Sequence, residues 1–191
     1  MTHRLLRAIK YLFVLVKYRK IIDEKVINLF LESIKNNVSF LIKEKTETFD
    51  ENNLQYLTRG SIIWVEFGFN IGHEFGGRHP ALVLKNINKG EDIYVVPLDS
   101  GSLPETKRKT NGEPKDGYIE IPKFNNNKET VFGMQKMDRW CSVYRLRCIS
   151  WILVDFSSTD AWMRSDYVEK IEEAVKKYHF NPLPRKILTK T

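Results

Sequence analysis

Two neighbouring stretches decide the fold: RGSIIWVEFG at residues 59–68 and GGRHPALVL at residues 76–84. In the first stretch, apolar side chains at 63, 65 and 67 alternate with the side chains at 62, 64 and 66. This period of two predicts a β-strand. In the second stretch, an apolar run follows Pro80 and predicts another short strand. Glycines between the two stretches mark a loop, so this pair opens a series of short strands.

Further apolar runs follow along the chain, and turn-forming residues separate them. The remaining strand candidates lie at 93–98, 118–121, 130–132 and 141–153. Gly, Pro, Asn and Ser gather between them, at 86–90, 100–117 and 125–127. Several short strands separated by such turn-forming residues favour a small barrel or sandwich.

Helices are expected before and after the strands along the chain. All ten Gly, all seven Pro and all four Trp come after Arg59, so the first part of the chain lacks helix breakers. Apolar stripes there predict helices at 3–20 and 22–45. A last helix should begin at a capping Ser165 or Asp166 and end before Pro182. We therefore divide the chain into an N-terminal helical extension, 1–57, and a second domain, 58–191.

The charge and the apolar content of the chain indicate which partners and which cellular location to expect. The formal net charge is +7, which is compatible with nucleic acid or with an anionic membrane surface. The longest early apolar run, 11–16, is too short for a membrane span or a signal peptide, so we expect a cytoplasmic protein without a membrane partner. A basic amphipathic helix lying on a membrane is an alternative for the extension, but packing against protein is favoured. Cys141 and Cys148 have no metal-ligand spacing, and we expect two free thiols on opposite faces of one strand.

The stretches at 59–84, together with YVVPLDS at 94–100 and GMQKMDR at 133–139, resemble the PemK/MazF family of toxins from toxin–antitoxin systems. The resemblance covers roughly 59–178. It implies an α+β, mainly β fold: a small SH3-like barrel with a C-terminal helix, here preceded by the helical extension. It also implies a homodimeric, metal-independent endoribonuclease that cuts single-stranded RNA. An antitoxin protein would cover the RNA groove, and no cofactor is expected.

The loop 68–79 and the end of the third strand hold the candidate site residues. RNA cleavage without a metal uses the adjacent 2′-hydroxyl, and it needs a base, an acid and a cation for the phosphorane. Histidine titrates near neutral pH, arginine binds phosphate as a planar fork, and glycine lets backbone N–H groups approach phosphate. Candidate catalytic residues are Arg78, His79, Glu74, Asp99 and Ser100. Candidate RNA-binding residues are His73, Gly76, Gly77, Lys107 and Arg108.

Two positions depart from the family pattern. The family has arginine directly before the proline, whereas here Arg78 and His79 stand in the reverse order, and Asp99 replaces the usual Thr or Ser. In an extended chain Arg78 and His79 point to opposite sides, so either His79 faces the phosphate or Arg78 does. We expect Arg78, because a neutral histidine cannot offset phosphorane charge.

The reversed order also keeps a rival function open. The rival is a non-catalytic binding module of the same fold, which binds RNA without cleaving it or binds a protein, as related toxins bind DNA gyrase.

The aromatic residues have two possible roles, which are RNA binding and packing. Trp140 and Tyr144 are candidates for stacking on RNA bases, although packing in a core or a dimer interface is favoured. Trp64 and Trp162 are expected in the core.

Overall fold

The computed structural model of the chain describes residues 10, 13–14, 17–18, 23–68, 76–123, 137–158 and 161–180. The chain forms two compact units: residues 1–47 with 68–74, and residues 48–67 with 75–191. Most of the predicted helix 3–20, the predicted strand 130–132 and the expected stop at Pro182 lie outside the described residues.

The first unit contains one long described helix, α2 (Glu24–Thr46), close to the predicted range of 22–45. The Asp23 carboxylate caps it by accepting a hydrogen bond of 2.8 Å from the Lys25 backbone N–H. Lys43 and Lys45 in its last turn complement the negative end of the helix dipole. The predicted apolar stripe is largely exposed at Ile34, Val38 and Leu41. Within the described residues, no helix is long and apolar enough to span a membrane.

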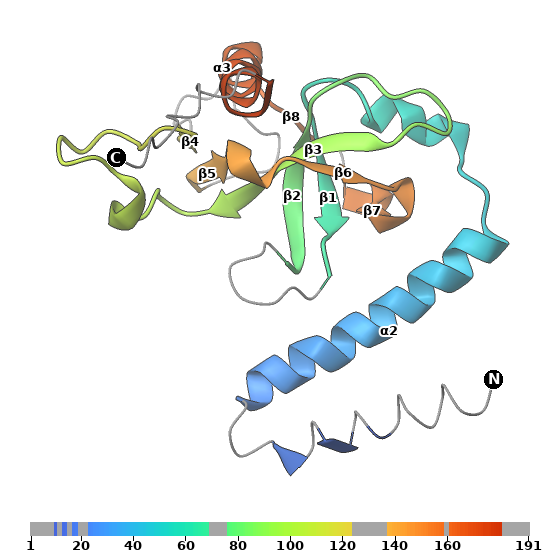
Figure 1. Cartoon of the computed structure of the whole chain (residues 1–191). Coiled ribbons are helices and arrows are strands. Elements are labelled where there is room, and N and C mark those ends of the chain that lie inside the picture. The colour runs from blue at the N-terminus through green and yellow to red at the C-terminus, as the bar shows by residue number, and fades with distance from the viewer. Residues whose placement is uncertain are drawn as a thin grey trace, which may run out of the picture. The chain divides into compact units, whose positions relative to one another are not determined.

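The second unit is built on an antiparallel sheet (Figure 1). Its eight strands are β1 (Ser61–Glu66), β2 (Arg78–Val83), β3 (Ile93–Ser100), β4 (Tyr118–Ile121), β5 (Arg139–Ser142), β6 (Arg147–Ile149), β7 (Val154–Asp155) and β8 (Ala161–Trp162). The order is β4-β5-β3-β2-β1-β7, with β6 also paired to β3 and β8 also paired to β1. The mainly-β architecture with flanking helices is as expected. Among the described strands, however, β4 and β7 do not pair, so the sheet stays open where a closed barrel was expected.

The predicted strand at 141–153 is in fact two strands separated by a turn. Leu98 of β3 pairs with Cys141, and Ile93 pairs with Ile149. Five steps along β3 therefore correspond to eight steps along the partner segment, and the 3₁₀ turn η3 (Val143–Arg145) holds the extra residues. The two cysteines thus lie in different strands, which corrects the expectation of one. Cys141 is buried and Cys148 is exposed, and both are free thiols as predicted.

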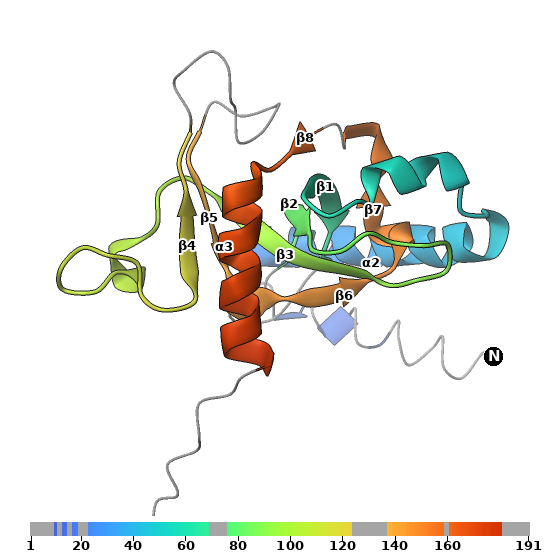
Figure 2. The same ribbon diagram turned by 90° about the horizontal axis from the view of Figure 1, so that it is seen from above.

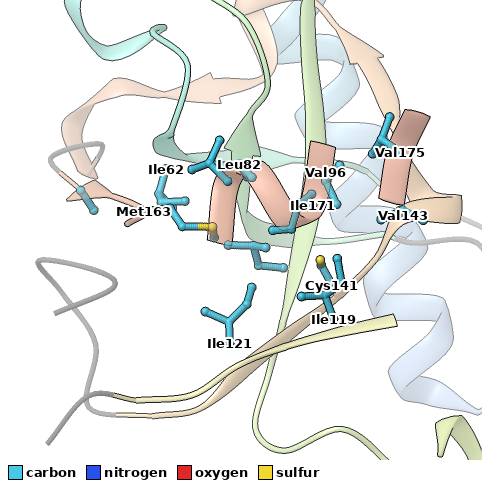
Figure 3. Packing of buried hydrophobic residues seen from close by; sticks show 13 residues of the cluster. Ile62, Leu82, Val96, Ile119, Ile121, Cys141, Val143, Met163, Ile171 and Val175 are labelled. Carbon is cyan, nitrogen blue, oxygen red and sulfur yellow. The ribbon is translucent and has the colours of Figure 1, made fainter. Parts of the chain in front are cut away.

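Strand alternation sends apolar side chains into two layers. On one face of the sheet, Ile62, Leu82 and Val96 pack with the C-terminal helix α3 (Ser165–Val175). Figure 3 shows Ile171 and Val175 of this helix among the sheet side chains. The other layer is a cluster of buried residues with large side chains packed at its margin. These residues are Leu57, Ile63, Val65, Phe67, Ala81, Val83, Ile87, Ile93, Val95, Ile149 and Val154, with Phe49, Trp151, Leu153 and Phe156 at the margin.

The start of α3 differs from the sequence prediction. Its N-cap residue is Arg164, which makes no side-chain capping bond, so the prediction that Ser165 or Asp166 caps the helix was wrong. Asp166 instead accepts two hydrogen bonds of 2.6 Å from the Arg164 guanidinium. A carboxylate in the first turn still interacts favourably with the positive end of the helix dipole. The helix continues into a π-helical turn, η6 (Lys176–Phe180).

Candidate functional site

His79 lies near the start of β2, two residues after Gly77. Gly77 has φ of 81°, the left-handed conformation that glycine adopts readily. A Cβ atom on Gly77 would stand 3.9 Å from Nε2 of His79, so the imidazole packs close to this backbone. The backbone N–H of Phe67 donates to the Gly77 carbonyl at 2.9 Å and joins the two ends of the loop. The chain therefore enters β2 with His79 fixed at the neck of the loop.

Arg78 and His79 face opposite sides of the sheet, as alternation predicts. In the register of β1 and β2, Arg78 lies opposite Glu66 and His79 lies opposite Val65. The Arg78 guanidinium donates to Asp155 at 2.5 Å and stands 4.5 Å from the centre of the Trp64 ring. Arg78 is therefore held on the face of Trp64 and Asp155, away from His79.

His79 lies across from Asp99 on the neighbouring strand. Ala81 of β2 pairs with Pro97 of β3, and two steps further along each strand stand His79 and Asp99. Asp99 Oδ2 accepts a hydrogen bond of 2.6 Å from Arg145, in an ion pair whose side chains are only 21% and 30% exposed. Arg139 of β5 is 4% exposed, and its charge acts on both Asp99 and His79. We call these four residues the His79 cluster.

Burial dominates the ionisation of this cluster. It lowers the pKa of His79 from its usual value, although the Asp99 charge and the carbonyls of Leu98 and Gly76 act in the opposite direction. Burial likewise raises the pKa of Asp99, against the charges of Arg145, His79 and Arg139. It also lowers the pKa of Arg139, but an arginine remains protonated in proteins. At neutral pH the cluster therefore combines a neutral imidazole with two guanidinium groups.

The other predicted site residues lie in different places. Ser100 is exposed at the end of β3, on the opposite face from Asp99 by alternation. Gly76 lies beside Gly77 at the loop neck, whereas His73 and Glu74 lie outside the described residues. The Arg108 guanidinium is bound by the carboxylates of Glu120 and Glu105.

Lys107 and the four tryptophan and tyrosine candidates complete the set of predicted residues. Lys107 stands with Nζ 5.2 Å from the centre of the Tyr118 ring. Trp140 is 7% exposed and Tyr144 is 52% exposed. Trp64 is partly buried beneath Arg78, but Trp162 is 49% exposed. The expectation that Trp162 belongs to the core was therefore wrong.

The two cations of the His79 cluster were not among the predicted site residues. Arg145 reaches Asp99 only because η3 interrupts the pairing of β3 with β5 and β6. No local sequence pattern predicts this turn. Arg139 lies in a stretch that carried the family resemblance, but nothing in the sequence distinguished it from the other arginines of the chain. In the described part of the chain, no group of three or more His, Cys, Asp and Glu residues is arranged to hold a metal ion.

Comparison with known proteins identifies the family. The family model described as "PemK-like, MazF-like toxin of type II toxin-antitoxin system" matches residues 58–178. The structure of MazF (Form-I) from Deinococcus radiodurans is 18% identical, with a TM-score of 0.38, over 63% of this chain and 93% of that chain. That of MazE-MazF (Form-II) from the same organism is 18% identical, with a TM-score of 0.37, over 63% and 92%. A comparison with curated proteins gave no match. Because the family model spans more than half of the chain, this protein belongs to the PemK-like, MazF-like toxins of type II toxin–antitoxin systems.

Proposed function

We propose that the protein is an endoribonuclease toxin that cleaves single-stranded RNA without a metal ion, and that the His79 cluster is its catalytic site. The observation that carries the proposal is the pairing of a partly buried His79, with a lowered pKa, and the Asp99–Arg145 ion pair across β2 and β3. A base next to fixed cations is what transesterification of RNA requires. The family assignment and the net charge of +7 agree with an RNA substrate.

The reaction divides into roles that these residues can fill. Neutral His79 accepts the proton of the 2′-hydroxyl as the 2′-oxygen attacks the adjacent phosphorus. Arg145 stabilises the negative charge that develops on the phosphorane oxygens, and the buried Arg139 adds its positive charge to the site without being exposed to the phosphate. The bond from phosphorus to the 5′-oxygen then breaks, and the 5′-oxygen takes a proton from imidazolium or from water. The products are a 2′,3′-cyclic phosphate and a 5′-hydroxyl.

Asp99 and Arg78 have supporting places in this scheme. Asp99 is a positioning residue, because it holds Arg145 and adds repulsion if it approaches phosphate directly. Arg78 is engaged by Asp155 on the other face, so we assign the phosphate contact to the His79 side. This choice reverses the expectation from sequence. Glu74 and His73 stay candidates for the acid and for an RNA contact.

The proposal is tested by incubating the purified protein with a long single-stranded RNA in excess EDTA. We expect discrete fragments that end in a cyclic phosphate or a 3′-phosphate. His79→Ala and Arg145→Ala should each slow cleavage by about 10²–10³, the typical loss for one such group. Arg78→Ala is the matched control, since it also removes a cation from β2, and should cleave within severalfold of wild type.

Three outcomes would count against the proposal. Cleavage that appears only when magnesium is added would contradict the metal-independent mechanism. Loss of activity in Arg78→Ala with normal His79→Ala would show that the two roles are reversed. Intact RNA that nevertheless binds the protein would favour the rival function, a binding module without catalysis.

The proposed partner is an antitoxin protein that covers the RNA site, and the proposed setting is a homodimer in the cytoplasm. The family consists of toxins from toxin–antitoxin systems, and one of the similar structures is of MazE-MazF, which supports an antitoxin partner. The excess of basic residues suits an acidic partner. Co-expression with the product of the neighbouring gene should give a co-purified complex that does not cleave RNA.

A further inference from the structure

Tyr144 is an exposed aromatic side chain that the fold holds in a fixed place. It lies in η3 and is 52% exposed. Its Cε2, Cζ and Oη atoms occupy the space next to Gly117, where a Cβ atom would meet them at 2.5 to 2.9 Å. Its hydroxyl donates to the Asp116 carbonyl at 3.2 Å. One edge of the ring is thus seated on the backbone, while much of the ring remains open to solvent.

Tyr144 is the middle of a continuous series of aromatic rings. The Tyr118 ring lies 6.1 Å from Trp140 and 6.2 Å from Tyr144, measured between ring centres. Tyr178 of η6 lies 5.4 Å from Tyr144. The bond of 2.7 Å between His179 Nε2 and the Val143 carbonyl fastens this turn to η3. We call Trp140, Tyr118, Tyr144 and Tyr178 the aromatic track.

Cations accompany three of the four rings. Arg145 stands 5.6 Å from the centre of Trp140, Lys107 stands 5.2 Å from Tyr118, and Lys177 stands 5.1 Å from Tyr178. The carboxylate of Asp116 lies nearby, but Lys109 binds it at 3.1 Å. Alternating π-faces and positive charges are the features that bind single-stranded nucleic acid, because bases stack on the rings while phosphates meet the cations.

The aromatic track begins at the His79 cluster. Trp140 pairs with Asp99 across β3 and β5, and Arg145 contacts both residues. From there the track follows β4 and β5 toward the end of α3, elements that Figure 2 shows close together. An RNA strand bound at the cluster therefore meets the aromatic track next, on the face of β4 and β5 away from α3. It then passes η3 to reach Tyr178, which packs in the layer of α3 on the opposite face.

We propose that single-stranded RNA extends from the cleavage site along the aromatic track, with one base stacked on Tyr144. This inference rests on the proposed function, because it takes the His79 cluster as the place where the strand is cut. It assigns Tyr144 a role in substrate binding that is separate from the chemistry. Lys107 and Lys177 contribute phosphate contacts on either side of it.

The test measures binding without cleavage. The probe is a labelled single-stranded RNA of about 10 nucleotides in which fluorine replaces every 2′-hydroxyl, so no nucleophile is present. Fluorescence anisotropy at one salt concentration compares wild type, Tyr144→Ala, Tyr144→Phe and Trp162→Ala. Trp162 is the matched control, since it is 49% exposed but lies in β8, outside the aromatic track. Thermal melting checks that each variant is folded, and Tyr144→Leu replaces Tyr144→Ala if that variant does not fold.

We expect Tyr144→Ala to weaken binding about tenfold or more, the usual loss for one stacked base, while Tyr144→Phe and Trp162→Ala bind like wild type. Equal binding by Tyr144→Ala and wild type would overturn the proposal, as would equal losses in Tyr144→Ala and Trp162→Ala. If Tyr144→Phe loses as much as Tyr144→Ala, the hydroxyl and not the ring is needed, and stacking is wrong. Normal RNA binding together with loss of antitoxin binding in Tyr144→Ala would make the track a protein-docking surface.

The two proposals fail in different ways. Tyr144-dependent binding of the probe by a protein that cuts no natural RNA would refute only the proposed function. Cleavage that depends on His79 but ignores Tyr144, with unchanged probe binding, would refute only the aromatic track.

Discussion

A single step along β2 decides which side chain meets Asp99. The two side chains at the start of the strand diverge, so Arg78 joins Asp155 and Trp64 while His79 joins the neighbouring strand. The positive charges near His79 and Asp99 come from Arg145 and Arg139. Replacing a permanent cation by a titratable imidazole makes the site sensitive to pH.

This sensitivity leads to a prediction about the pH dependence of cleavage. Because burial lowers the pKa of His79 from its usual value of about 6.5, the neutral base predominates at pH 7 and is lost on acidification below that usual value. The acidic limb of the kcat/KM profile should therefore have its midpoint below 6.5, and it should disappear in His79→Ala. A midpoint above 7 would contradict His79 as the base.

The lowered pKa of His79 also makes the stability of the protein depend on pH. As pH falls through about 6.5, the unfolded state takes up the His79 proton before the folded state does, so the free energy of unfolding decreases. The melting temperature of wild type should thus fall more between pH 7 and pH 5 than that of His79→Gln. Comparing the two proteins cancels the contributions of the shared groups that do not interact with His79, whereas Asp99, which does interact with it, contributes to the difference.

Among the elements, the strands that sequence analysis located well are those with local signals. β1 carries apolar side chains at every second position from Ile63, and Gly60 and Gly68 bracket it. β2 and β3 are bounded by turn residues in the same way. The turn η3 has no such signal, because tertiary contacts create it: Val143 is buried, its N–H donates to the Gly117 carbonyl at 2.9 Å, and Tyr144 rests on Gly117. The place of Arg145 depends on this turn, so this member of the candidate site could not be predicted from the sequence.

The helix α3 supplies a prediction about stability at the scale of an element. Ile171 is fully buried against the sheet residues of its layer (Figure 3). Ile171→Ala removes apolar contacts and leaves a cavity, which typically lowers the free energy of unfolding by about 2–5 kcal/mol. Urea unfolding measures the change, and Glu173→Ala, an exposed position on the same helix, should stay within about 0.5 kcal/mol of wild type. Equal midpoints for the two variants would mean that α3 does not cover the sheet.

At the scale of the whole molecule, the two units set the smallest chain that should carry the site. Sequence composition predicts a boundary after residue 57, and the family model begins at residue 58. The second compact unit, however, begins at Thr48. Leu57 is 1% exposed within its core, and its carbonyl accepts a hydrogen bond of 3.1 Å from the Ile87 N–H. Phe49 lies edge-on to Trp151, with ring centres 5.5 Å apart.

We therefore predict that a chain of residues 48–191 folds and cleaves RNA, whereas a chain of residues 58–191 is much less stable. The shorter chain loses Leu57 and Phe49 from one of the two core layers, and removal of one large buried side chain alone costs about 2–5 kcal/mol. Urea unfolding of both chains measures the difference. Leu57→Ala in the 48–191 chain separates the lost side chain from the lost backbone, and should fall between the two. If both chains unfold at the same urea concentration, residues 48–57 add nothing to the core. If the 48–191 chain is stable but does not cut RNA that the full chain cuts, α2 belongs to the functional site.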